Sequence, residues 1–212
     1  MKIKHAAELL EKAGIKVSYS IDFIKEEVPP YTNYYQLEKR DTWEYGLFIC
    51  ERENHPYIRN IYKFDSEDRG VKYFFLDRLS SYYFTNRIQP FIAQHNELDI
   101  GGTGFSEERL VKALNLLNIP SSYLYDKNNK NHTNTTMSIS IEQTPDMLYQ
   151  LSLRGKNGVI LQSIPSMSRQ RALFMVFKKI YLLFIYDTTV RKTLQNSGLL
   201  SEFTEEDIKY FL

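Results

Sequence analysis

The feature that most constrains the fold of this chain is an internal repeat. When the sequence is compared with itself at the shift that brings Leu10 onto Leu114, many identical residues coincide, and from Ser66 onward the matching shift brings Ser66 onto Ser166. The other pairs are Ile15/Ile119, Ser18/Ser122, Tyr19/Tyr123, Asp22/Asp126, Glu38/Glu142, Tyr45/Tyr149 and Leu47/Leu151, followed by Arg69/Arg169, Phe74/Phe174 and Phe84/Phe184. The sequence therefore predicts two copies of one unit.

The ends of the first helical patterns support the repeat. Gly14 ends the pattern in the first copy and Asn118 ends it in the second. Gly and Asn are the residues that most readily take the left-handed conformation that closes a helix. An apolar residue, Ile15 or Ile119, then follows in each copy. We therefore expect the two copies to share local structure as well as identities.

The apolar spacing predicts that each copy is an α+β unit made of a helix, a four-stranded antiparallel meander and a long helix. In the first copy the expected elements are a helix over 2–13, strands over 15–23, 34–39, 43–52 and 57–64, and a long helix that begins at Asp65 or Ser66 and stops at Pro90. In the second they are a helix capped by Ser106, strands over 119–125, 137–143, 147–155 and 159–164, and a long helix from Ser168 to about Leu194.

This pattern predicts a tandem duplication with pseudo-twofold symmetry. The expected organisation is a first repeat over 1–97, a Gly-rich linker over 98–104, a second repeat over 105–196 and a C-terminal segment over 197–212 with a short helix capped at Thr204. The linker contains the run Gly-Gly-Thr-Gly before a helix. It lacks the spacing of a phosphate-binding loop, so we interpret it as a connection between copies.

Composition restricts the class of protein. The formal net charge is +1, so the overall charge does not predict binding to nucleic acid or to an anionic membrane. A single cysteine, Cys50, is typical of a reducing compartment, and the start of the sequence is an amphipathic helix, so we expect a cytoplasmic protein. The most apolar segment, Ala172–Tyr186, contains Lys178 and Lys179 and is too short to span a membrane, so we predict no membrane contact.

No catalytic arrangement is recognisable. The four histidines are far apart in sequence, and no second His or Cys stands at the spacing of a metal site. Cys50 has no nearby histidine, and there is no GxSxG motif. We therefore predict a protein that is not an enzyme and that has no cofactor and no bound metal. An enzyme stays open as a third interpretation, which would require a polar cluster in a cleft.

Two regions are candidates for partner binding. The loop after the first strand is long in both copies, at Lys25–Asn33 and Lys127–Thr136, and long loops in compact domains are often functional. The first version is stiffened by two prolines and carries a tyrosine, which makes it the favoured contact site. The residues that we predict to contact a partner here are Pro29, Pro30, Tyr31, Tyr34 and Trp43.

The second candidate region is the basic part of the second copy. Between Met147 and Ser201 the charged residues are Arg154, Lys156, Arg169, Arg171, Lys178, Lys179, Arg191, Lys192 and the lone acid Asp187. Basic residues interleaved with aromatics favour nucleic acid or an acidic partner, with Arg154, Lys156, Arg169 and Arg171 as contacts. Two alternatives are that these residues solubilise an apolar helix, or that they face acidic residues of the first copy.

The strand Tyr57–Phe64 followed by DSEDRGVKYFFLDRL at the start of a helix makes residues 1–90 resemble the immunity proteins of bacterial polymorphic toxin systems. The chain is similar to that group in size, aromatic content and lack of catalytic residues. The resemblance implies a protein that binds and neutralises one toxin. We expect it to act by occluding the toxin, and the repeat predicts a monomer with pseudo-twofold symmetry or a homodimer. Many nuclease inhibitors of this kind are strongly acidic, and this chain is not. The alternative is a nucleic-acid-binding or regulatory protein that uses the basic second copy.

Overall fold

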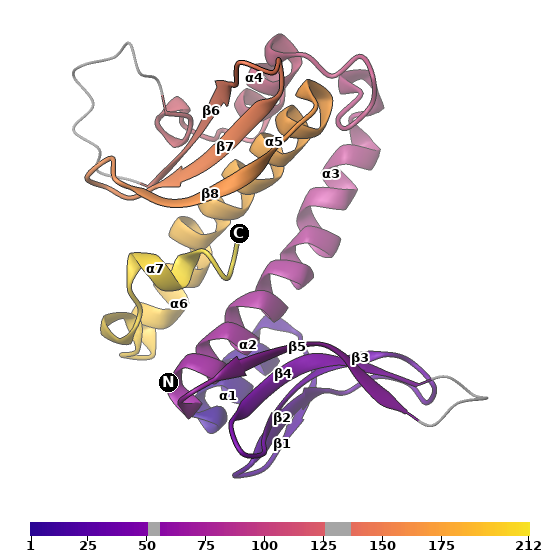
Figure 1. Ribbon diagram of the computed structural model, residues 1–212, viewed down its shortest axis with the longest axis vertical. Helices are drawn as coiled ribbons and strands as arrows, with labels where there is room; N and C mark the ends of the chain where they lie inside the picture. Colours follow the sequence, from indigo (N-terminus) through magenta and orange to yellow (C-terminus); the bar gives the residue numbers. More distant parts are fainter. Residues whose placement is uncertain (51–55, 126–136) are drawn as a thin grey trace. The chain divides into compact units, whose positions relative to one another are not determined.

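The computed structural model of the chain describes residues 1–50, 56–125 and 137–212. It is an α+β protein in which helices pack against antiparallel sheets (Figure 1). The chain divides into two compact units: unit 1 is Met1–Tyr82 with Ser197–Phe203, and unit 2 is Tyr83–Asn196 with Thr204–Leu212. The boundaries predicted at 97 and 104 separate sequence repeats, whereas these units are defined by packing.

Unit 1 contains a helix, a five-stranded meander and most of a long helix. The elements are α1 (Ile3–Ala13), β1 (Val17–Tyr19), β2 (Phe23–Glu26), β3 (Tyr34–Lys39), β4 (Trp43–Ile49), β5 (Tyr57–Phe64) and α2 (Glu67–Tyr83), with strand order β1-β2-β3-β4-β5. The prediction of one strand over 15–23 was wrong. The chain reverses at Ser20, whose N–H donates to the carbonyl of Phe23 at 2.9 Å, and so two short strands form.

Unit 2 has a three-stranded sheet. Its elements are α3 (Gln89–Gln94), α4 (Glu107–Leu116), β6 (Ser138–Gln143), β7 (Tyr149–Arg154), β8 (Ile160–Met167), α5 (Arg169–Ile185), α6 (Arg191–Asn196) and α7 (Glu205–Ile208). The predicted strand over 119–125 is absent from the described residues, because Pro120 starts a 3-10 helix at Ser121–Tyr123 and Leu124 makes a single parallel bridge to Ile139. Among the described residues, the four-stranded meander predicted for each copy is therefore corrected to five strands in unit 1 and three in unit 2.

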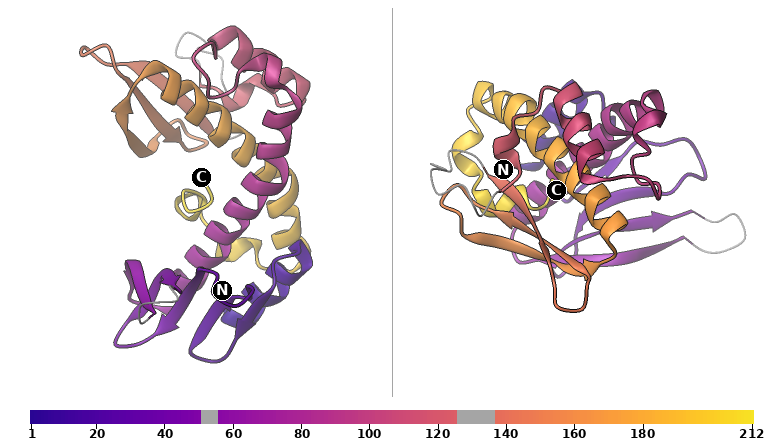
Figure 2. Two further views of the ribbon diagram at one scale, coloured as in Figure 1. Left: turned by 90° about the vertical axis from the view of Figure 1, so that its right-hand side faces the viewer. Right: turned by 90° about the horizontal axis from the view of Figure 1, so that it is seen from above.

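The helices of unit 1 cover one face of its sheet. Ile24, Leu37 and Tyr45 lie side by side on β2, β3 and β4, and all three are buried. The ring of Tyr45 contacts Tyr73 and Phe74 of α2, so this is the face that packs on the helix. Because side chains alternate along a strand, the residues between them lie on the opposite face. Figure 2 shows both sheets from two further directions.

In unit 2, helix α5 packs on the sheet through β6 and β7. Ile139 of β6 and Leu153 of β7 are paired neighbours and are buried on the same face. Phe177 and Ile180 are fully buried residues of α5. These side chains form an apolar core, in accordance with the predicted burial of the helix. No helix of the described residues is long and apolar enough to span a membrane.

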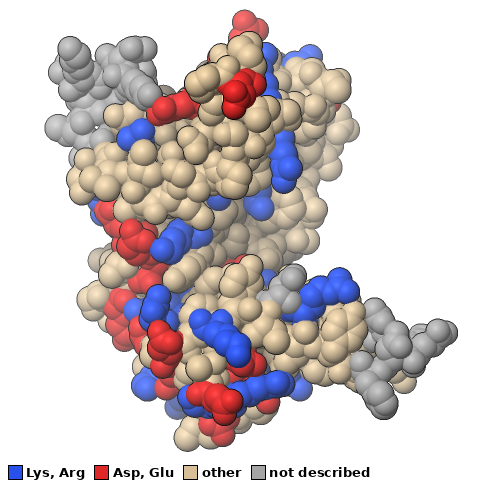
Figure 3. All heavy atoms as spheres, viewed as in Figure 1, with Lys and Arg blue, Asp and Glu red and all other residues tan. Residues whose placement is uncertain are grey.

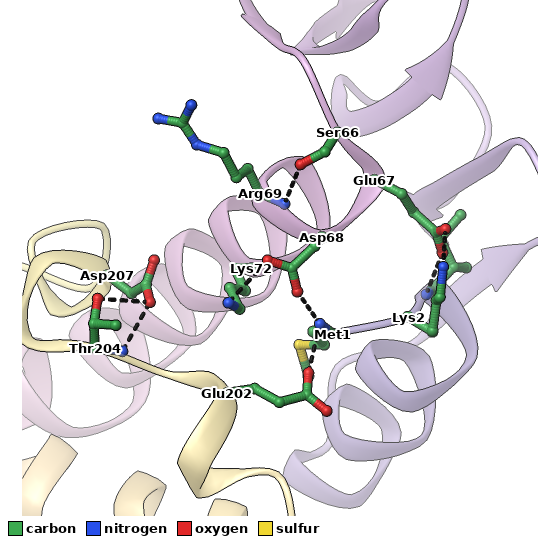
Figure 4. A network of polar contacts seen from close by, with 11 residues as sticks. Met1, Lys2, Ser66, Glu67, Asp68, Arg69, Lys72, Glu202, Thr204 and Asp207 are labelled. Carbon is green, nitrogen blue, oxygen red and sulfur yellow. Dashed lines mark hydrogen bonds and ion pairs between the residues drawn. The ribbon is translucent and has the colours of Figure 1, made fainter.

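The predicted closures of α1 and α4 and the predicted caps of α4 and α7 are confirmed. Gly14 and Asn118 both have positive φ, at 95° and 53°, and the N–H groups of Ile15 and Ile119 both close the preceding helix at 2.9 Å. The hydroxyl of Ser106 accepts from the N–H of Arg109 at the start of α4. Thr204 forms the expected cap of α7 together with Asp207, as Figure 4 shows.

The start of α2 is joined to the start of α1 by polar contacts. Glu67 accepts from the ammonium of Lys2 at 2.7 Å and from the N–H of Ile3 at 3.4 Å (Figure 4). The neighbouring Asp68 pairs with Lys72 at 2.9 Å. Acidic side chains in the first turn of α2 are favoured by the helix dipole. These contacts fix where α2 crosses the sheet.

Both long helices continue through a π-helical turn. The first consists of α2 with 17 residues, the turn Phe84–Ile88 and α3 with six residues, and the second of α5 with 17 residues, the turn Tyr186–Val190 and α6 with six residues. The prediction that Pro90 stops the first helix was wrong. The wide turn, in which Gln89 donates to the carbonyl of Phe84, leads into α3 with the proline in its first turn, where the missing N–H costs little.

Candidate partner-binding surface

The loop between β2 and β3 contains a tight turn that displays a tyrosine. The N–H of Thr32 donates to the carbonyl of Pro29 at 3.2 Å, so Pro30 and Tyr31 are the central residues of the turn. Tyr31 has φ of 64° and is 70% exposed. This combination of Pro followed by positive φ is that of a type II turn, whose second central position favours Gly. A large side chain held in this conformation is typical of functional sites.

The base of this loop is held by an arginine of α2. Arg78 is 5% exposed, its guanidinium pairs with Glu26 at 3.1 Å, and it lies 3.6 Å from the ring centroid of Tyr35. Glu26 also accepts from the N–H of Tyr35 at 2.8 Å. Because Glu26 ends β2 and Tyr35 lies in β3, these contacts join the two ends of the loop. We call Arg78, Glu26 and Tyr35 the clamp.

The clamp continues into a buried polar cluster. Asp77 accepts from Nε of Arg78 at 3.1 Å and from the hydroxyl of Tyr45. Burial raises the pKa of the Tyr45 hydroxyl far above its usual range, and the nearby Asp77 adds to this. Burial alone would lower the pKa of Arg78, but the groups of Tyr45, Asp77 and Glu26 outweigh it and raise the pKa. The cluster therefore keeps a charged arginine and a neutral tyrosine in the core, which gives the loop a rigid base.

An apolar row lies on the open face of the sheet, at the edge where the loop emerges. Tyr34, Phe48 and Ile58 are paired neighbours on β3, β4 and β5, and the rings of Tyr34 and Phe48 stack at 4.9 Å. The N–H of Cys50 donates to Oδ1 of Asn33 at 2.8 Å, which fastens the end of β4 to the loop. We call the turn Pro29–Tyr31 and the residues Tyr34, Phe48 and Ile58 the turn-and-row surface.

A glycine shapes this surface. A Cβ at Gly46 would lie 2.4 Å from Cγ2 of Ile58 and 3.1 Å from the carbonyl oxygen of Arg59. Gly46 therefore allows Ile58 to lie over the sheet beside Phe48. Burial raises the pKa of the Tyr34 hydroxyl, with smaller contributions from Cys50 and Glu38. The row is thus a half-buried apolar strip with the polar end of Tyr34 at its margin.

The structure places four of the five residues predicted around this loop on the turn-and-row surface: Pro29, Pro30, Tyr31 and Tyr34. The fifth, Trp43, is 7% exposed and packs beside Gly70 on the face that α2 covers, so the prediction of a partner contact there is corrected. Along β4, Trp43 lies two residues from the buried Tyr45, so both side chains are on the core face. The loop Lys127–Thr136 of the second copy lies outside the described residues, as do Glu51 and Glu53, two of the acidic residues of the first copy that the basic residues of the second were expected to face.

Arg154, one of the four basic residues predicted as contacts, is already engaged within unit 2. It donates to Oγ of Ser140 at 3.1 Å and to the carbonyl of Gly158 at 3.0 Å, pairs with Glu142 at 3.3 Å, and lies 4.3 Å from the ring centroid of Tyr125. These contacts consume most of the donors of its guanidinium. Arg154 therefore stabilises the sheet of unit 2.

The other three basic residues are exposed but do not form one cluster with it. Arg169 pairs with Glu107 at 3.1 Å, Arg171 lies in the first turn of α5, and Lys156 lies in the turn between β7 and β8. The strand β8 contains no charged residue. In Figure 3, residues that are neither basic nor acidic make up most of the visible surface of β7 and β8. The nucleic-acid alternative stays a prediction.

The Gly-rich run predicted as a linker is a hydrogen-bonded loop. The N–H of Gly104 donates to Oδ2 of Asp99 at 2.6 Å, and Gln170 donates to the carbonyl of Gly101 at 2.8 Å. Both contacts are made within unit 2. In the part of the chain that the structure describes, no group of three or more His, Cys, Asp or Glu residues is placed to hold a metal ion.

Sequence reasoning missed Phe48, Ile58 and the clamp. Phe48 and Ile58 could have been found, because alternation along 43–52 and 57–64 places a second set of residues on the face opposite Trp43. The clamp had no such signal, since Arg78 and Glu26 are far apart in sequence. Comparison with known proteins adds no constraint, because no family model, curated protein or solved structure matches the chain.

Proposed function

We propose that this chain is a non-enzymatic protein that binds a protein partner through the turn-and-row surface. The observation that carries the proposal is Tyr31, a largely exposed aromatic residue held at positive φ. Left-handed backbone costs a residue with a Cβ about 1–2 kcal/mol. Such a conformation persists when selection for another property outweighs that cost, and recognition by an exposed tyrosine is the property that fits here.

The stiffness of the turn supports the same proposal. Prolines at positions 29 and 30 restrict the backbone before Tyr31, and the clamp holds the base of the loop. Ordering a flexible loop on binding lowers affinity, so a loop that is rigid beforehand binds more tightly. Tyr34, Phe48 and Ile58 supply adjacent apolar area without further ordering. The surface thus has the two components of an interface centre, an aromatic anchor and a preformed apolar patch.

The class of binding protein that we propose is a cytoplasmic immunity protein that occludes a bacterial toxin. The resemblance of residues 1–90 to immunity proteins supports this class, and the turn-and-row surface lies within that segment. Occlusion requires a surface and no catalytic group. A rigid, pre-shaped surface suits an inhibitor that must bind one target tightly.

Co-expression tests this proposal. The product of the adjacent gene is expressed in bacteria alone and together with the chain, and survival and complex formation are measured. We expect rescue by the wild-type chain, and loss of at least tenfold in affinity for Tyr31→Ala, because interface tyrosines are frequent hot spots. Tyr19→Ala is the matched control, since Tyr19 is an exposed tyrosine on β1 away from this surface. Equal effects of the two variants, or no rescue by the wild type, would contradict the proposal.

We also propose that the two sequence repeats, 1–97 and 105–196, arose by tandem duplication. The similar long helices support it, because π-helical turns are rare and each long helix has one after 17 residues. The turns place Phe84 opposite Tyr186, two residues beyond the Phe184 with which the sequence repeat pairs it. The pairing of β4 with β5 and that of β7 with β8 are both irregular at the paired positions Tyr45–Leu47 and Tyr149–Leu151. Relatives of the chain test the proposal: an independent origin predicts that the first half of one relative never matches the second half of another.

A further inference from the structure

The charges on the open face of the unit 1 sheet are matched except at one residue. On strands β2–β5 this face carries Lys25, Glu38, Glu44 and Lys63. Lys63 pairs with Glu44 at 3.1 Å, and Glu38 pairs with Arg40 at 3.3 Å. Figure 3 shows such positive and negative side chains next to one another over unit 1. Within the described residues, Lys25 has no acidic partner.

Lys25 lies among aromatic rings instead. Its ammonium is 5.7 Å from the ring centroid of Phe23 and 5.6 Å from that of Tyr34. On the neighbouring strand it is paired with Ser18, whose Oγ is buried and has no hydrogen-bond partner among the described residues. An ammonium has three donors, and the rings use none of them as a hydrogen bond. The environment therefore holds the ammonium in place without neutralising it.

We propose that Lys25 receives a carboxylate of the protein partner, next to the apolar row that receives a neighbouring side chain. This inference rests on the proposed function and specifies the chemistry of the partner. The row Tyr34, Phe48 and Ile58 adjoins Lys25 through Tyr34, which contacts both. The partner thus presents Asp or Glu beside an aliphatic or aromatic residue, and the aromatic surroundings of Lys25 shield the resulting ion pair from water.

The same face disfavours other occupants. A phosphate backbone binds through several cations, whereas here Glu38 and Glu44 lie on the same face as Lys25. A second copy of the chain would bring the same apolar row and the same unmatched lysine to the interface, so two like charges would approach each other. Complementarity of charge therefore favours an acidic protein surface.

A displayed library of random 12-residue peptides tests this inference with the whole chain. Peptides are selected on immobilised wild-type protein, and the affinity of the enriched peptides is measured for variants. We expect enrichment of Asp or Glu next to an apolar residue, a loss of at least tenfold for Lys25→Met, retention within about threefold for Lys25→Arg, and selection of basic peptides by Lys25→Glu. Lys63→Met is the matched control, a lysine on the same face that is already paired, and should change affinity less than twofold.

The outcomes separate the two proposals. Enrichment without acidic residues, or equal affinity for Lys25→Met and the wild type, overturns the role of Lys25. If Phe48→Ala and Tyr31→Ala still abolish binding in that case, the turn-and-row surface stands and the proposed function is unaffected. If those variants also bind normally, the surface itself is refuted. A wild-type dimer in light scattering that Lys25→Glu dissociates would identify a second copy as the occupant and overturn the inference.

Discussion

The two long helices, which begin with α2 and α5, have the same length and the same π-helical turn, yet α2 and α5 bury different polar groups. At the same distance from the helix start, α2 carries Asp77 and Arg78, whereas α5 carries Lys179 and Ile180. Arg78 has two carboxylate partners. Lys179 is 7% exposed and donates to the backbone carbonyl of Leu212 at 2.7 Å. Thus α2 buries an arginine that is matched by two carboxylates, whereas α5 buries a lysine that has no carboxylate partner among the described residues.

This difference follows the use of the loops. In unit 1 the buried charges clamp the base of the Pro29–Tyr31 turn. In unit 2 the segment before β6 is held from the π-helical turn, where Asp187 accepts from the hydroxyl of Tyr123 at 3.0 Å and pairs with Arg191 at 2.5 Å. The buried residues of α5 are therefore not needed to position this segment. A buried ion cluster costs desolvation, so its presence on α2, without a counterpart on α5 among the described residues, indicates that it positions the loop.

Removal of the two buried cations should have opposite effects, and this is the largest difference that we predict. Arg78→Met leaves the half-buried carboxylates of Glu26 and Asp77 without their buried partner, so unit 1 should lose about 3 kcal/mol of unfolding free energy. Lys179→Met removes a buried charge that has no acidic partner in the described residues, so unit 2 should be unchanged or gain up to about 2 kcal/mol. Urea denaturation of both variants measures these changes. Similar losses in the two variants would refute the comparison.

The pH dependence of unit 2 should reveal Lys179. Burial, together with the neighbouring Lys178, lowers its pKa from 10.5 to about 8. Between these values the unfolded chain holds a proton that the folded chain has released, so stability rises with pH. From about pH 7.5 to about pH 9.5, the wild type should gain about 2 kcal/mol relative to Lys179→Met. Because both proteins contain the same other titrating groups, the contributions of those groups cancel in the difference between their unfolding free energies. If that difference is constant across this pH range, Lys179 does not titrate there.

The π-helical turns should differ in the same way. Asp187→Asn weakens the contacts to Tyr123 and Arg191, and because Tyr123 is buried, we expect a loss of about 1–2 kcal/mol in unit 2. Thr85 is the second residue of the first π-helical turn, as Asp187 is of the second, and it is exposed. Thr85→Ala should therefore change stability by less than about 0.5 kcal/mol. Thermal unfolding measures both, and equal effects would show that the turn Tyr186–Val190 has no special role.

The elements that local signals specify were predicted well. The strands 34–39 and 57–64 coincide with β3 and β5, and the helix closures at Gly14 and Asn118 follow from residues that tolerate positive φ. The errors arose where a wider context decides. The reversal at Ser20 splits a segment whose alternation predicts one strand, and the turn Phe84–Ile88 carries a helix past a proline. Neither is visible in hydrophobic periodicity.

The site was predicted in part for the same reason. Pro29, Pro30 and Tyr31 are recognisable because proline and an exposed aromatic residue are local features. Trp43 was assigned to a partner although its period placed it on the core face. Lys25 and Arg78 gave no signal, because a charge is matched or unmatched only with respect to residues that the fold brings near. Contacts between distant segments decide which charged residue supports the structure and which faces a partner.

The smallest change in stability that we predict concerns two residues with strained backbone, one proposed to bind the partner and one not. Tyr31 in unit 1 and Met147 in unit 2 both have positive φ, at 64° and 59°, and are 70% and 73% exposed. Substitution by Gly relieves the left-handed backbone and removes little buried area, so each variant should gain about 0.5–1 kcal/mol after the entropy cost of Gly. Denaturation curves should therefore rank the two variants together.

Partner binding should separate them. Tyr31→Gly removes the proposed anchor and should weaken binding at least tenfold, whereas Met147→Gly should leave affinity unchanged. A gain in stability together with a loss of binding at Tyr31 is the signature of a residue kept for recognition at the expense of folding. If Met147→Gly weakens binding as much as Tyr31→Gly, the partner also contacts the turn between β6 and β7, and the division of roles between the two units is wrong.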